Sequence, residues 1–309
     1  GIANIQNFSS SSNFLDLGDG ITIRGRSFED LRILLKWGDD KLKLLEDDWS
    51  QGAFGQHVLM VEQKFPKSPD NFISMSTGLE WAKAQNALMG LRLLKPGEVR
   101  IGRMFHSRPA SFNVGIGGVS STGFTVWHPG NAYHLEPAET DDFRRVYGLI
   151  QNFHKTFSGN WTNVEVALRS FSSIYDRYLH QAEDCILDAI TALEALFGIS
   201  NELSFRLAFL TATILSRNDD ERVNGFQEIK KYYKVRNAIV HGKSLKAEER
   251  LAITNDEPLR AHVRRLLVAV LNLIESGAYS SSSHLRENLE DTILHSGRLQ
   301  DLRQKMRLV

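Results

Sequence analysis

The strongest constraint on the fold is a series of six apolar stripes that begins near residue 140. In each stripe, hydrophobic residues recur at steps of three and four, the spacing of one face of an α-helix. The first stripe follows Thr140, a candidate helix cap. The stripes cover about residues 143–157, 164–178, 186–197, 203–214, 219–243 and 255–275. Six successive helices joined by short connections predict an antiparallel helical bundle, with shorter helical pieces around 284–308.

The first half has a different character, because glycine and proline are concentrated there. A Ser-rich segment at the N-terminus is expected to be a tether, followed by a helix capped by Ser27. A second helix is expected from about Gly78 to Leu94, ended by Pro96-Gly97. Short β-like runs cover residues 99–105, 111–116 and 123–127. The sequence therefore predicts an α+β protein, with a mixed α/β domain and small antiparallel sheet in residues 1–139 and an all-α domain in residues 140–309.

The charge balance limits how this chain can hold nucleic acid. Lys+Arg and Asp+Glu both number 37, so overall positive charge is excluded as the means of binding. Residues 230–250 nevertheless contain seven basic residues and two acidic ones. This local excess indicates either a binding patch or a solvated helix end, where basic residues are favoured in any case.

The sequence gives no sign of a metal site, a cofactor or a membrane anchor. Cys185 is the one cysteine, which excludes an internal disulfide framework and a zinc site with several cysteines. His106, His128 and His134 lack metal-ligand spacing. No apolar run reaches the roughly 18 to 20 residues that span a bilayer, and a signal-peptide pattern is missing. We expect a cytoplasmic protein with no metal and no cofactor.

The stretch YYKVRNAIVHGK at 232–243 combines polar and apolar residues within one predicted helix. At about 100° per residue, one face carries Tyr232, Val235, Ala238, Ile239 and Gly242. The opposite face carries Tyr233, Arg236, Asn237, Val240 and His241. The first face suits the bundle core. The second predicts another contact surface, most simply with a second copy of the chain, so a homodimer through this helix is expected.

Three segments in this order resemble the Apea-like branch of the HEPN domain superfamily: DCILDAITALEALFG at 184–198, NELSFRLAFLTATIL at 201–215 and YYKVRNAIVHGK at 232–243. R-N-A-I-V-H matches the Arg-x4–6-His signature of that family. The resemblance covers about residues 140–280, and the first half resembles no family.

The resemblance implies a dimerising helical bundle that brings two Arg/His motifs together. Many HEPN proteins are metal-independent endoribonucleases in phage defence, toxin–antitoxin pairs or RNA processing. In the implied reaction the RNA 2′-hydroxyl attacks and leaves a 2′,3′-cyclic phosphate, His241 moves the proton, and Arg236 neutralises the charge on the phosphorane. Asn237 orients the histidine or binds the phosphate, and Tyr233, Lys234 and Lys243 are the expected substrate-binding residues.

Alternatives remain open at this point. Some HEPN proteins bind RNA, nucleotides or protein partners without catalysis, and the first half could select a target or a protein partner. Glu194 and Arg206 are expected to form a buried bridge that aligns the bundle. Arg264 and Arg265 could reach phosphate, or they could lie on a solvated face.

Overall fold

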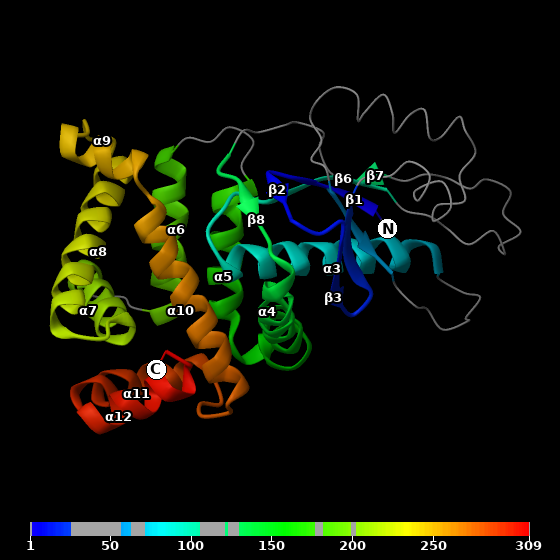
Figure 1. The fold of residues 1–309 in the computed structure, drawn as a ribbon. Helices are drawn as coiled ribbons and strands as arrows, with labels where there is room; N and C mark the ends of the chain where they lie inside the picture. Colours follow the sequence, from blue (N-terminus) through cyan, green and yellow to red (C-terminus); the bar gives the residue numbers. More distant parts are fainter. Residues whose placement is uncertain are drawn as a thin grey trace, which may run out of the picture. The chain divides into compact units, whose positions relative to one another are not determined.

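The chain forms two compact units, Gly1–Tyr147 and Gly148–Val309, and each is described here by itself. The computed structural model describes residues 2–25, 57–62, 72–105, 121–122, 130–176, 182–198 and 202–308. The boundary between the units falls within helix α4 (Thr140–Asn152) (Figure 1). Within these ranges, no helix is long and apolar enough to cross a membrane.

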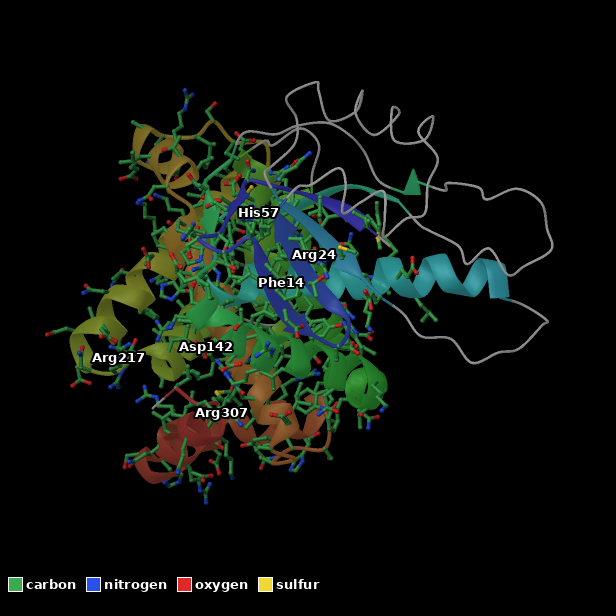
Figure 2. The ribbon with its side chains drawn as sticks, turned by 45° about the vertical axis from the view of Figure 1, so that its right-hand side comes forward. Phe14, Arg24, His57, Asp142, Arg217 and Arg307 are labelled. Carbon is green, nitrogen blue, oxygen red and sulfur yellow. The ribbon has the colours of Figure 1, made fainter. Side chains whose placement is uncertain are left out.

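The first unit contains a six-stranded sheet in which every neighbouring pair of strands is antiparallel. The strand order is β3 (Phe14–Gly18), β4 (Ile21–Gly25), β5 (His57–Val61), β1 (Ile2–Gln6), β6 (Arg100–Phe105) and β7 (Ser121–Thr122). Alternation along β3 buries Leu15 and Leu17. On the partly exposed face, the Arg24 guanidinium lies 5.0 Å from the ring centroid of its cross-strand neighbour Phe14 (Figure 2). The small antiparallel sheet expected from the sequence is confirmed.

The N-terminal segment is not the tether that its serines suggested. Strand β1 lies between β5 and β6, where Ile2, Ala3 and Ile5 are buried. Its partners are far away in the sequence, so neither local pattern nor composition reveals the pairing. The run at 99–105 is confirmed as β6. The runs at 111–116 and 123–127 and the helix after Ser27 lie outside the described residues.

Helix α3 (Phe72–Leu94) supplies the rest of the core of this unit. It ends at the predicted residue and begins before the predicted start. Ala84, Ala87, Leu88 and Leu91 are buried against the sheet. Small residues at two of these four positions allow the helix to lie close to the strands.

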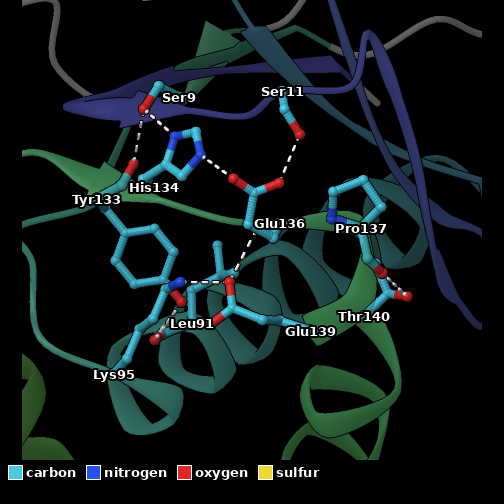
Figure 3. A network of polar contacts seen from close by, with 10 residues as sticks. All are labelled: Ser9, Ser11, Leu91, Lys95, Tyr133, His134, Glu136, Pro137, Glu139 and Thr140. Carbon is cyan, nitrogen blue, oxygen red and sulfur yellow. Dashed lines mark hydrogen bonds and ion pairs between the residues drawn. The ribbon is translucent and has the colours of Figure 1, made fainter.

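A polar network joins the N-terminal segment to residues 133–140 (Figure 3). Strand β2 (Phe8–Ser9) pairs in parallel with β8 (Tyr133–His134), and Ser9 Oγ lies 2.8 Å from His134 Nδ1. The other ring nitrogen of His134 lies 2.6 Å from Glu136, which also accepts a 2.5 Å hydrogen bond from Ser11. These two hydrogen bonds lower the pKa of Glu136. His134 therefore holds two segments together, in keeping with its lack of metal-ligand spacing.

The second unit is a helical bundle. After a π-helical turn (Phe153–Phe157) and a 3₁₀ turn (Ser158–Asn160), its helices are α5 (Thr162–Asp176), α6 (Ala182–Phe197), α7 (Leu203–Leu215), α8 (Asp219–Val240), α9 (Ala247–Thr254), α10 (Glu257–Glu275), α11 (Ser282–Leu294) and α12 (Ser296–Lys305). Helix α5 packs against α6, α7 against α8, and α10 against α5, α6 and α7. The all-α second half predicted from the stripes is confirmed.

Two details differ from the prediction. Helix α9 was not expected, because its eight residues are too few to show a clear apolar period. Helix α10 begins at Glu257, two residues after the predicted start, and Pro258 lies in its first turn. Proline suits that position because the first N–H groups of a helix have no partner within it.

Candidate functional site at the end of helix α8

The RNAIVH stretch forms the last turns and the cap of α8. His241 is the C-cap residue, and Gly242 follows in the left-handed conformation, with φ of +61°. The Gly242 N–H donates to the Ile239 carbonyl at 3.0 Å, and the Lys243 N–H donates to the Ala238 carbonyl at 2.9 Å. This pair of bonds is a Schellman ending, for which glycine is the favoured residue. The helix therefore stops directly after the motif and leaves the His241 side chain exposed.

The predicted core face of α8 is confirmed at three of its five residues, while Ile239 is half-buried and Gly242 is exposed. Tyr232, Val235 and Ala238 are buried in the bundle. The Tyr232 hydroxyl donates a 2.6 Å hydrogen bond to the Asn255 carbonyl, just before α10. Burial raises the pKa of Tyr232 above its usual range, so the phenol stays neutral. This face anchors the motif to the bundle.

The opposite face is exposed in one part and covered in another. Val240 is 53% exposed, and His241 is exposed beside it. Tyr233, expected on this face, is instead only 5% exposed, because α6 and α7 both pack against α8. Burial raises the pKa of Tyr233, and the negative charge of Glu194 raises it further. Tyr233 is therefore a neutral, buried ring beside the motif.

Three groups position Arg236. Its guanidinium lies 3.5 Å from a carboxylate oxygen of Glu194 on α6, and it donates to the side-chain oxygen of Asn237 at 3.2 Å. The guanidinium carbon also lies 5.7 Å from the ring centroid of Tyr233, the arrangement of a cation–π contact. The Arg236 side chain remains about 25% exposed. A guanidinium has five N–H donors, so Arg236 is oriented and still has donors for another anion.

The two candidate lysines differ. Lys234 points to α9, where its ammonium lies 3.4 Å from both Glu248 and Glu249. These carboxylates raise the pKa of Lys234. Lys243 is exposed beyond the helix end, and the part of the chain that is described supplies no partner for its side chain. Of the two, Lys243 is the one available to a ligand.

Sequence reasoning missed the role of Glu194. The predicted Glu194–Arg206 bridge is wrong: Arg206 pairs with Glu290 on α11, and Glu194 pairs with Arg236. The sequence did contain a sign of this role. Glu194 lies in the last turn of α6, and that turn contains no basic residue. A carboxylate near a helix C-terminus is disfavoured by the helix dipole, so it calls for a cation from elsewhere.

One chain thus brings Arg236, Asn237, Tyr233 and Glu194 together and places His241 at the adjoining helix end. Among the described residues, the His241 ring has no hydrogen-bond partner, so both of its nitrogens are open to a ligand. No group of three or more potential metal ligands occurs within these same ranges. The arrangement offers a fixed cation at Arg236 and, five residues later at the helix end, an exposed imidazole at His241. A guanidinium suits a phosphate group and an imidazole can carry a proton.

Comparisons with models of known protein families, with curated proteins and with solved structures find no match to this chain.

Proposed function

We propose that this protein is a metal-independent endoribonuclease of HEPN type. The observation that carries the proposal is the presence, at the end of one helix, of an oriented, partly exposed Arg236 and of an exposed His241 that has no hydrogen-bond partner among the described residues. In an RNA-cleaving reaction, the 2′-hydroxyl attacks the adjacent phosphorus and the 5′-oxygen leaves. His241 moves the proton, and Arg236 neutralises the charge that develops on the phosphorane oxygens.

A homodimer is part of this proposal. Val240 and His241 are exposed next to each other, so a second copy packed on this face would bring two motifs together. The N-terminal unit would then select the RNA target or a protein partner. A cytoplasmic role in defence or in a toxin–antitoxin pair fits such an enzyme.

A non-catalytic HEPN module that binds RNA, a nucleotide or a protein is the second candidate, and one observation favours it. Glu194 lies 3.5 Å from Arg236, so its carboxylate competes with any phosphate for the guanidinium. If Glu194 keeps the Arg236 guanidinium occupied, this surface binds its ligand without cleaving it.

The decisive test incubates the purified protein with mixed single-stranded and structured RNA in the presence of EDTA. Cleavage should persist without divalent metal, and a substrate with a 2′-deoxy nucleotide at the cleavage site should resist, because its nucleophile is missing. Cleavage that stops in EDTA, or that continues at the deoxy position, contradicts the proposal. Binding without cleavage favours the non-catalytic module.

A further inference from the structure

Three phenylalanine rings form a cluster on α7 and α8. Phe205 and Phe209 stack with ring centroids 5.8 Å apart and planes 5° apart. Phe226 meets Phe205 edge-on, with centroids 5.7 Å apart and planes 76° apart. Phe205 is nevertheless 53% exposed, so the stack ends in an aromatic ring that faces solvent.

The exposed end of the stack adjoins an open hollow of about 650 Å³. The hollow is lined by Glu202, Leu203, Ser204, Phe205 and Tyr233. Phe209 covers one face of the Phe205 ring and Phe226 meets it edge-on. A flat group that enters the hollow could therefore extend the stack by one ring.

This hollow leads to the candidate site. Tyr233 lines the hollow and also lies under the Arg236 guanidinium, at 5.7 Å. Along α8, Phe226, Lys230, Tyr233 and Asn237 follow one another at steps of four, three and four, so they share one face of the helix. The aromatic cluster and the phosphate-binding candidate therefore lie on a single stripe.

The charges along the stripe favour an anionic ligand. The Lys230 ammonium lies 5.2 Å from the Phe226 ring centroid, and Arg236, which follows six residues later beside the stripe, lies over the Tyr233 ring. Of the residues that line the hollow, Glu202 is the charged one, and the two cations lie beyond its aromatic walls. Lys230 lies on Phe226, which contacts Phe205, and Arg236 lies on Tyr233, so the order is cation, hollow and cation. A ligand with a flat face and a phosphate on either side matches this order.

We propose that the hollow between Phe205 and Tyr233 takes an unpaired RNA base next to the phosphate at Arg236. The base stacks on Phe205, and Lys230 and Arg236 contact the backbone on its two sides. Bases of single-stranded RNA expose their faces to such platforms, whereas duplex RNA keeps them stacked. This inference rests on the proposed function and adds to it a preference for single-stranded substrate with one bound base.

The test uses the full chain with His241→Ala, so that bound RNA is not cut, and measures fluorescence anisotropy with a labelled single-stranded RNA. Phe205→Ala should weaken binding about 5- to 100-fold, the range expected for loss of one stacked base. Phe205→Trp should retain binding, because its ring can still stack. The matched control is Leu251→Ala, since Leu251 is also an exposed apolar side chain, at 65%, and lies on α9 away from the hollow.

A series of RNAs with a single abasic position identifies the bound base. One position should weaken binding to the chain that keeps Phe205, and the same position should have no further effect on Phe205→Ala, because the two changes remove one contact. Additive losses at every position overturn the inference. So does equal affinity of Phe205→Ala and its parent, or the absence of RNA binding.

Light scattering tests whether a second copy of the chain, and not an RNA base, covers Phe205. If Phe205→Ala converts a dimer into a monomer, the stack is a subunit interface and the inference is overturned. The two proposals fail separately: wild-type protein that binds RNA through Phe205 but never cuts it refutes the catalytic proposal alone. Wild-type protein that cuts RNA while Phe205→Ala binds normally refutes the base-binding inference alone.

Discussion

Two clusters in the helical unit each combine arginine, glutamate and tyrosine, and they differ in how exposed the arginine is. At the start of α10, Arg260 and Arg264 are each 6% exposed. Arg260 lies 2.8 Å from Asp256, and Arg264 lies 3.2 Å from Glu257 and 3.3 Å from the Tyr175 hydroxyl.

At the end of α8, Arg236 is 25% exposed and faces one carboxylate, at 3.5 Å. The first cluster matches its charges internally, which suits a structural role. The second keeps a cation accessible to solvent. Residue type therefore identifies neither cluster as functional. Exposure and remaining donors distinguish them.

The largest expected effect falls on the exposed site. His241→Ala should reduce the rate of RNA cleavage by about 10² to 10⁴, the usual cost of removing a general acid or base. The melting temperature should not change, since the ring has no hydrogen-bond partner among the described residues. Cleavage rates and thermal melts of the two proteins measure this.

The matched control is His295→Ala, because His295 is also an exposed histidine that caps a helix, at the end of α11. It should cleave at the wild-type rate. Equal losses in the two variants would show that removal of an exposed histidine in general, and not the position of His241, explains the effect.

The second prediction concerns stability. Arg264→Ala should lower the free energy of unfolding by about 1.5 to 3 kcal/mol, because it removes a buried guanidinium that hydrogen-bonds Glu257 and the Tyr175 hydroxyl. Arg236→Ala should lower it by about 1 kcal/mol or less, since that pair is partly exposed. Urea unfolding followed by circular dichroism gives both values, and similar losses would erase the contrast between the clusters.

Glu194→Gln should have a smaller effect, about fivefold on each kinetic constant. Without the carboxylate charge, a phosphate meets less competition at Arg236, so KM for RNA should fall. The guanidinium also loses an orienting partner, so kcat should fall. Steady-state kinetics separates the two constants. If neither changes while the melting temperature drops, Glu194 is structural only.

The smallest expected effect is on the pH dependence of stability and concerns His57, which is buried in the first unit. Burial lowers the pKa of His57 (labelled in Figure 2), so the folded chain favours its neutral form. The unfolded chain binds protons near pH 6.5, so stability should be lost as the pH falls below that value. His57→Gln should make the decline of the melting temperature between pH 7 and pH 5 less steep. An identical slope would contradict the assignment.

The sequence predicted those parts of the fold that are encoded locally. The stripes that became α4 to α8 and α10 repeat within single helices, so a short window of sequence reveals them. The N-terminal strands could not be found in this way. Strand β1 pairs with β5 and β6, whose residues lie about 50 to 100 positions away, and pairing partners at such distances leave no local pattern.

The site shows the same limit. Helical spacing correctly placed Tyr232, Val235 and Ala238 in the core, because one helix determines its own faces. The same spacing placed Tyr233 on the face expected to meet a second copy, whereas α6 and α7 of the same chain cover it, and these are separate segments that one helix does not reveal. The partner of Glu194 was also mistaken, because ion pairs between helices depend on the packing angle.

The chemical form of the RNA ends tests the central claim most directly, that the end of α8 cleaves RNA with the substrate's own 2′-hydroxyl. Products made by the wild-type protein in EDTA would be analysed by mass spectrometry. We predict fragments with 2′,3′-cyclic phosphate and 5′-hydroxyl ends. Fragments with 3′-hydroxyl and 5′-phosphate ends would contradict the account, because they require water and not the 2′-hydroxyl as the nucleophile.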